Sequence, residues 1–229
     1  MKDLHVTAAF KEQTITLPYK EKVPCSFIVK DIGKLKISTG KLVACDPLVC
    51  PETEAFDISL PAGEYPVQLA IAHIKDDQRV AYAKLIIKNQ PVSSWKMALL
   101  SGQSLSKLQQ DEYFGYSVDS GTGCFGDKHA MDVLCDKMTK VDDYYEKILN
   151  ECDKTYVHTW SWCNLQIDDN LKSNVIVFST GFGDGLYSTW IGYSEDGDIA
   201  CVVTDFDIVF EDDESEQVET QGRKWWKFW

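Results

Sequence analysis

The chain has 229 residues, 44% of them hydrophobic and 12% aromatic, and its formal net charge at pH 7 is -13. This apolar content is enough for the core of one large domain or two small ones. An acidic protein repels phosphate backbones and anionic membrane surfaces, because both are normally bound by clustered lysine and arginine. We therefore expect no nucleic acid and no membrane as a partner, and a basic protein as the more natural one.

The N-terminal residues give no sign of a targeting signal. Charged side chains stand at Lys2, Asp3, Lys11 and Glu12, and the first fourteen residues contain no apolar run long enough for a signal-peptide core. No later stretch approaches the length of a membrane span. These features predict a soluble protein of the cytoplasm.

The first hundred residues have the pattern of β-strands joined by turns. Five segments favour strands, and glycine or proline separates the first four of them: 26–29, 34–38, 41–44, 64–74 and 80–87. Lysine alternates with apolar residues over 34–37, which indicates a strand with one face in water. We predict an antiparallel β unit over residues 1–100.

The cysteines are expected to be free, buried thiols rather than disulfides. There are eight of them. Cys135 and Cys152 fall on the apolar faces of predicted helices and Cys201 falls in a β-prone run, where a reduced cysteine behaves as a small hydrophobic residue.

Zinc is a separate question, because Cys45 and Cys50 are separated by four residues, as are Cys124 and His129. Structural zinc sites usually show tighter paired spacings. We therefore predict neither a metal nor a cofactor.

The middle of the chain contains two predicted helices. Apolar residues recur at intervals of three and four over 131–138 and again over 141–152, which is the pattern of an amphipathic helix. Together with the strands that follow, these helices predict an α+β unit over residues 101–210.

A glycine-rich turn at 119–127 precedes the first of these helices. It resembles a phosphate-binding loop only superficially, because Asp127 occupies the position of the lysine that such a loop needs. The alternative is that Asp127 caps the helix by accepting hydrogen bonds from its first amides, while the glycines allow the turn. This alternative is the stronger one.

A second glycine-rich stretch spans residues 181–206. Segments 174–179, 186–193 and 198–210 favour strands, and the short turns between them predict a three-stranded meander. The sequence Gly183-Asp184-Gly185 lets the backbone turn sharply and presents Asp184 to a ligand or a neighbouring loop. The alternation of oxygen ligands with a distal glutamate that a calcium loop requires is absent from this stretch.

Residues 211–229 differ in composition from the rest of the chain. An acidic linker leads to a basic and aromatic end that contains Trp225, Trp226 and Trp229. Exposed tryptophans usually mark contacts, so this tail is expected either to dock on the protein itself or a neighbouring subunit, or to capture a partner.

Several ordered motifs resemble the DUF4241 family, a bacterial family of uncharacterised function. They are Asp46-Pro47, the segments 61–67, 118–123 and 181–187, and Asp205-Phe206, and they span about residues 40–206. The resemblance implies no chemistry. It implies that six of these residues belong to a shared pattern: Asp119, Gly121, Asp184, Gly185, Tyr187 and Asp205.

These observations predict an α+β, predominantly β protein, an antiparallel sheet or sandwich with two central helices. We expect a non-enzymatic binding protein, possible forms of which are an immunity protein or an inhibitor of a basic toxin. A hydrolase or other small-molecule enzyme stays open, because paired carboxylates on two facing loops can divide general-acid and general-base roles. A metal-binding domain is the third possibility. The candidate ligand or partner site consists of Asp119, Gly121, Asp127, Asp184, Gly185, Tyr187, Trp190 and Asp205.

Overall fold

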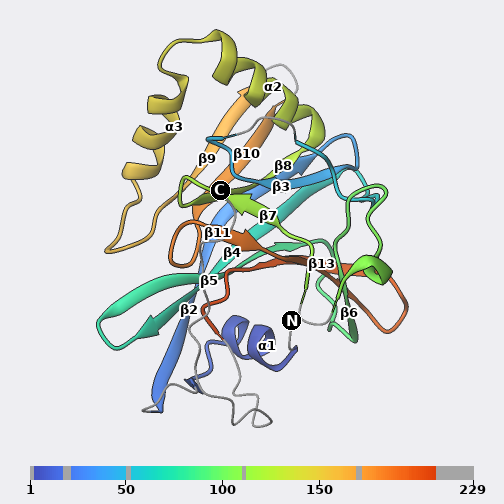
Figure 1. Cartoon of the computed structure of the whole chain (residues 1–229), viewed down its shortest axis with the longest axis vertical. Helices are drawn as coiled ribbons and strands as arrows, with labels where there is room; N and C mark the ends of the chain where they lie inside the picture. Colours follow the sequence, from blue (N-terminus) through green and yellow to red (C-terminus); the bar gives the residue numbers. More distant parts are fainter. Residues whose placement is uncertain (1–2, 18–21, 50–52, 110–111, 169–171, 210–229) are drawn as a thin grey trace.

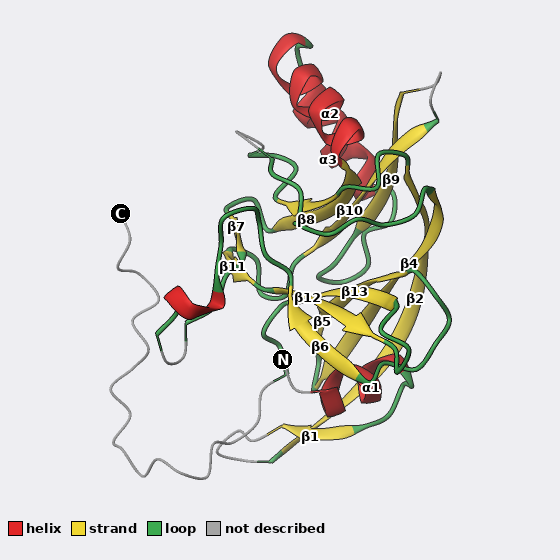
Figure 2. Cartoon of the chain, turned by 90° about the vertical axis from the view of Figure 1, so that its right-hand side faces the viewer, coloured by secondary structure: helices red, strands yellow, loops and turns green. Residues whose placement is uncertain are grey.

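Two antiparallel sheets lie face to face and form the body of the protein (Figures 1 and 2). The computed structural model describes residues 3–17, 22–49, 53–109, 112–168 and 172–209. The fold is α+β and predominantly β, as predicted. The predicted tail contacts at Trp225, Trp226 and Trp229 lie outside the described residues.

The larger sheet has seven strands in the order β1-β2-β4-β5-β13-β12-β6. Long alternating segments form its centre, and they confirm the strands predicted over 64–74 and 80–87. The two strands predicted over 26–29 and 34–38 are one strand, β2, which is irregular between Asp31 and Lys34 instead of broken at Gly33. The strands are β1 (Ile15–Leu17), β2 (Val23–Ile37), β4 (Gly63–Ile74), β5 (Asp77–Ile86), β6 (Ser94–Met97), β12 (Thr189–Tyr193) and β13 (Ile199–Asp205).

The smaller sheet has four strands in the order β3-β8-β10-β9, and a separate ribbon pairs β11 with β7. The four strands are β3 (Leu42–Cys45), β8 (Thr122–Asp127), β9 (Trp162–Asp168) and β10 (Ser173–Ser179). The ribbon strands are β7 (Tyr116–Val118) and β11 (Gly185–Tyr187).

The two predicted helices are confirmed as α2 (Lys128–Lys140) and α3 (Tyr144–Asp153). They cover the outer face of the smaller sheet, while α1 (Asp3–Phe10) lies against the larger sheet at the opposite end of the molecule (Figure 2). The sequence did not predict α1, whose eight residues lack a clear apolar stripe. A short 3-10 helix, η1 (Leu105–Lys107), follows β6.

Apolar side chains fill two layers. The main core lies between the two sheets and includes fully buried Phe125, Phe178 and Leu69. A second core lies between the smaller sheet and the two helices, where Met131, Leu134 and Ile148 pack on strands β8, β9 and β10. Strand β10 is buried on both sides, which explains its nearly continuous apolar sequence.

The predicted three-stranded meander is wrong. Strand β10 belongs to the smaller sheet, whereas β12 and β13 form a hairpin in the larger one. The segment predicted as one strand over 186–193 is divided at Ser188 into β11 and β12. Both sheets also join strands from residues 1–100 to strands from residues 101–210, so the predicted N-terminal unit has no sheet of its own.

Candidate functional site

The two glycine-rich loops that the sequence singles out lie side by side. Strands β7 and β11 pair with Val118 opposite Gly185 and Tyr116 opposite Tyr187. Beyond this ribbon, the backbone amide of Gly121 donates a hydrogen bond of 3.1 Å to Oδ1 of Asp184. The structure therefore brings together Asp119, Gly121, Asp184, Gly185 and Tyr187 from the predicted set.

The loop that carries Asp184 is held in shape from inside. The hydroxyl groups of Thr180 and Tyr187 both donate hydrogen bonds of 2.8 Å to the carbonyl oxygen of Gly183. Across the junction, Gly121 has a φ of +68°, a conformation that residues with a Cβ rarely adopt. The Asp184 carboxylate is consequently presented to solvent on a fixed backbone.

Asp46 supports the other loop and was not among the predicted site residues. Its buried carboxylate accepts hydrogen bonds from the amides of Asp119, Ser120 and Leu48 and from the hydroxyl of Ser120, at 2.7 to 3.0 Å. Four donors satisfy both carboxylate oxygens. Asp46 is thus a structural anchor for the Asp119 loop, and the only sign of it in the sequence is its place before Pro47.

Asp127 has a similar structural role. It is fully buried, and one carboxylate oxygen accepts hydrogen bonds from the amides of Ser38 and Thr39 and from the Thr39 hydroxyl, at 2.8 to 2.9 Å. The other oxygen accepts from the His129 amide at 3.1 Å, which confirms the predicted helix cap. Asp127 therefore faces away from solvent and does not share a surface with Asp184.

Asp205 and Trp190 lie on the larger sheet. In the larger sheet, Asp205 lies opposite Tyr82, and Trp190 lies opposite Val203, two residues before Asp205 on β13. Both side chains are therefore on the same face as Tyr82, whose ring lies 6.4 Å from that of Phe10 in α1. Burial, followed by the nearby Asp207, raises the pKa of Asp205 to about 7, although the Asp207 amide donates to its carboxylate at 3.0 Å. Trp190 is half-buried and its indole donates to the Ser188 hydroxyl at 2.8 Å.

Apolar side chains that the sequence did not single out are exposed around the loop junction. Phe182, Leu186 and Tyr113 are 62%, 44% and 37% exposed. The Tyr113 hydroxyl donates to the Leu186 carbonyl oxygen at 3.0 Å, and the exposed carboxylates of Asp119 and Asp184 lie on the same two loops. We call these five residues the loop-junction surface.

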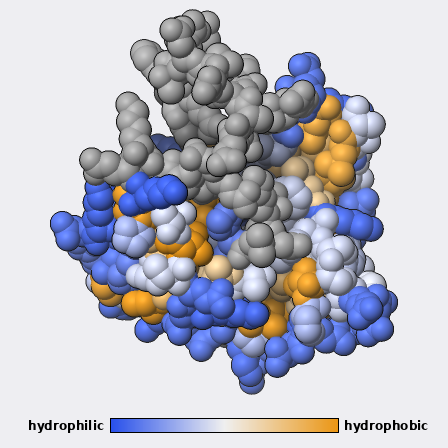
Figure 3. Space-filling view, turned by 90° about the horizontal axis from the view of Figure 1, so that it is seen from below, coloured by the Kyte–Doolittle hydropathy of each residue, from blue (hydrophilic) through white to orange (hydrophobic). Residues whose placement is uncertain are grey.

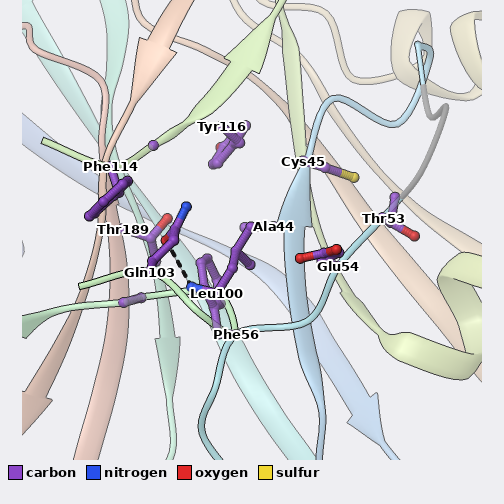
Figure 4. Close-up of a pocket in the computed structure, with 12 residues that line it drawn as sticks. Ala44, Cys45, Thr53, Glu54, Phe56, Leu100, Gln103, Phe114, Tyr116 and Thr189 are labelled. Atoms are coloured by element: carbon purple, nitrogen blue, oxygen red, sulfur yellow. Dashed lines mark hydrogen bonds between the residues drawn. The ribbon is translucent and has the colours of Figure 1, made fainter. Parts of the chain in front are cut away.

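A cavity of about 250 Å³ lies on the other side of β7 (Figure 4). Phe56 and Leu100 lie at its base, Phe114 and Tyr116 form one side, and Glu54 stands across from Gln103. The remaining lining residues are Ala44, Cys45, Thr53, Ala98, Gly115 and Thr189.

The polar groups of this cavity are partly unused. The side-chain oxygen of Gln103 accepts a hydrogen bond from the Leu100 amide at 2.9 Å. Within the part of the chain that the structure describes, the Gln103 side-chain NH2 and the Glu54 carboxylate have no hydrogen bond or ion pair. Their donor and acceptor capacity is available to a bound group.

Of the seven cysteines that the structure describes, all but Cys135 are the predicted free thiols, and five of these six are buried. The free thiols include Cys152 and Cys163, whose sulfur atoms lie 3.1 Å apart. The hydrogen bond from Cys152, followed by burial, raises the pKa of the Cys163 thiol. Cys135 is disulfide-bonded, so the prediction of a free thiol is wrong at that position.

The cysteine and histidine spacing that raised the question of zinc lies only partly within the described residues. Among the described residues, no group of three or more histidine, cysteine, aspartate or glutamate side chains is arranged to hold a metal ion. Cys50 of the considered pattern lies outside the described residues.

None of the helices in the described ranges combines the length and the apolar character that crossing a membrane requires.

The architecture defines a two-sheet α+β protein with a structured loop junction at one edge. Residues 35–204 match the family described as "Protein of unknown function (DUF4241)", and the chain belongs to this family. No match was found among curated proteins or solved structures. The family match includes the whole loop junction and excludes α1.

Proposed function

We propose that this protein is a non-enzymatic binding protein that recognises a basic protein partner through the loop-junction surface. The observation that carries the proposal is the exposure of Phe182, Leu186 and Tyr113 beside the carboxylates of Asp119 and Asp184. Grouped exposed apolar side chains usually mark contacts, and aromatic residues are enriched in interfaces. An immunity-like or inhibitor-like protein is one form that such binding takes.

The distribution of carboxylates supports binding over catalysis. Asp46 and Asp127 use both oxygens to hold the backbone, and Asp205 lies on the larger sheet. Asp119 and Asp184 are exposed at the junction, and the exposed Asp207 accepts a hydrogen bond from the Tyr113 hydroxyl at 3.4 Å. The whole chain has a formal net charge of -13. Together with these exposed carboxylates, this charge attracts a cationic partner and increases its association rate.

The neighbouring cavity suits one cationic side chain of such a partner. Gly115 lines the cavity and its backbone also lies against Leu186, so the cavity and the loop-junction surface share β7 and the residues before it as a wall. The Glu54 carboxylate has no partner among the residues that the structure describes, and Phe114 and Tyr116 offer ring faces to a lysine or arginine stem. A partner that covers the ribbon from both sides would therefore use both features.

Selection of displayed random peptides on the purified protein tests the proposal. We expect enriched peptides to combine lysine or arginine with an aromatic or large aliphatic residue, and to bind more weakly as salt increases. Phe182→Ser should lower their affinity by about tenfold or more, as expected for a central aromatic contact. Tyr145→Ser is the matched control, because Tyr145 is also exposed, on α3.

Two results contradict the proposal. One is enrichment of peptides without basic residues, and the other is equal loss of affinity in Phe182→Ser and Tyr145→Ser. The part played by the cavity is measured separately with Glu54→Gln against Glu195→Gln, which removes the same charge from an exposed turn. We expect only Glu54→Gln to weaken binding, by up to about fivefold for an exposed ion pair.

A further inference from the structure

Lys84 lies on the face of the larger sheet that α1 partly covers, far in sequence from the loop junction. It is in β5, opposite Gln68 of β4 and Val203 of β13. Its Nζ lies 3.6 Å from the centroid of the Phe10 ring, at the end of α1. Helix α1 therefore packs against the side-chain amine of Lys84, which belongs to a central strand of the larger sheet.

The amine of Lys84 has no hydrogen-bonding or ion-pair partner in the described portion of the chain. The residues of α1 near it, Val6, Thr7 and Phe10, are uncharged. The charged or titratable groups that influence it are Asp31 of β2 and Cys201 of β13. Lys88 lies nearby but is paired with Asp198 at 2.6 Å.

A cavity of about 160 Å³ opens beside this amine. Its apolar side chains include Phe10, Ile86, Val92 and Trp95, and Lys84 is one of its lining residues. Since a cavity of about 150 Å³ can bind benzene, this one has room for a molecule of about that size. Thr7, Lys88, Asn89 and Gln90 add polar groups, so the pocket combines apolar and polar lining. Among the described residues, Lys84 is its one amine without a hydrogen-bond or ion-pair partner.

Burial lowers the pKa of Lys84 to about 8, and Cys201 and Asp31 act weakly in the opposite direction. At pH 7 a group with this pKa is neutral in about a tenth of molecules, whereas an ordinary lysine is neutral in fewer than about one in a thousand. The neutral amine is the form that attacks carbonyl carbon.

We propose that Lys84 is a covalent binding site for small aldehydes with an apolar body. The amine lone pair attacks the aldehyde carbon and forms a carbon–nitrogen bond, while a proton moves from nitrogen to the carbonyl oxygen. Loss of that oxygen as water then gives an imine. Lys88, the other lysine of the cavity, is paired with Asp198, which leaves Lys84 as the reactive amine of the pocket.

The far end of the molecule, seen from below, is mainly hydrophilic with separate hydrophobic patches (Figure 3). Other lysines of the larger sheet serve for comparison. Lys96 is the best matched, because its Nζ also lies over an aromatic ring, that of Tyr193, at 5.1 Å, and it belongs to the same sheet. Lys96 does not line the cavity.

The test is to treat the intact protein with butanal and cyanoborohydride, whose hydride reduces the imine to a stable secondary amine. Peptide mapping by mass spectrometry then gives the rate at each lysine. At pH 7 we expect Lys84 to react at least about tenfold faster than Lys96, since far more of it is neutral. Its rate should rise with pH and level off above about pH 8, while that of Lys96 continues to rise.

Variants and a second aldehyde complete the test. Lys84→Arg should remove the fast modification and Lys96→Arg should leave it unchanged. A naphthaldehyde, too large for the cavity, should show no preference for Lys84. The proposal is overturned if Lys84 is unreactive, if it reacts no faster than Lys96, or if the large aldehyde shows the same preference as butanal.

Discussion

The amide of Gly121 and the carboxylate of Asp184 form a hydrogen bond of 3.1 Å between two loops that lie 63 residues apart in the sequence. This contact determines how Asp184 is presented, but it does not bury the carboxylate. Of the donors in the described residues, only the Gly121 amide is bonded to it, and the second oxygen remains open to water.

Asp184→Asn should therefore change stability very little. The asparagine oxygen still accepts from the Gly121 amide, and water solvates the exposed amide group. We expect the free energy of unfolding to change by less than about 1 kcal/mol. Urea denaturation measures this change, and a loss of several kcal/mol would contradict the solvent-facing role assigned to Asp184.

Asp127→Asn is expected to be much more harmful, although the substitution is chemically the same. The Asp127 carboxylate accepts four hydrogen bonds in a fully buried position, so an amide nitrogen would face at least one donor. Leaving buried donors unsatisfied costs about 2 to 4 kcal/mol in total. The same urea titration gives this value, and similar stabilities for Asp127→Asn and Asp184→Asn would refute the distinction.

Asp127 also shows what the sequence can predict. A glycine-rich turn followed by apolar residues at helical spacing is a local signal, and the structure has α2 with the Asp127 cap at that place. The strands of the first hundred residues are equally local, because alternation and turn residues mark them directly. The bonds from Asp127 to Ser38 and Thr39 could not be predicted, since they join distant parts of the chain.

The predicted meander failed for the same reason. Strand propensity over 174–179 shows that a strand forms, but it does not specify the neighbouring strand. Strand β10 pairs with β8 and β9, while β12 pairs with β13 and β6. The exposure of Leu186 was also unpredictable, because it depends on the pairing of β11 with β7 outside both main sheets.

Gly115→Ala tests how tightly the backbone before β7 packs against β11 in this ribbon. A Cβ at position 115 would lie 2.6 Å from the carbonyl oxygen and 2.8 Å from the carbonyl carbon of Tyr187. Because these are backbone atoms, the ribbon must shift, and we expect a loss of about 1 to 3 kcal/mol. Ser117→Ala, at an exposed position of β7, is the control and should change stability by less than about 0.5 kcal/mol.

A thermal melt is sufficient to compare these two variants. In a protein of this size, a loss of 1 kcal/mol lowers the melting temperature by about 2 to 4 °C. Gly115→Ala should therefore melt several degrees below both the parent protein and Ser117→Ala. Equal melting temperatures for the two variants would mean that the ribbon is not tightly packed at this position.

The elevated pKa of Asp205 predicts a specific pH dependence of stability. Burial, followed by the charge of Asp207, raises the pKa to about 7, whereas an unfolded chain has an aspartate pKa of about 3.9. Between these values the folded protein holds a proton that the unfolded chain has released. Its stability therefore falls as pH rises through this window, by up to about 1.4 kcal/mol per pH unit, and stops falling above about pH 7.

Asp205→Asn should remove this contribution, because the amide does not ionise and its oxygen still accepts from the Asp207 amide. We expect the variant to gain about 2 to 3 kcal/mol relative to the parent protein between pH 5 and pH 7 in urea denaturation. Asp196→Asn removes the same charge at an exposed turn, and it controls for general repulsion in an acidic protein. If the pH profiles of the parent and Asp205→Asn run parallel, then Asp205 is ionised in the folded state and its surroundings are more polar than the buried position indicates.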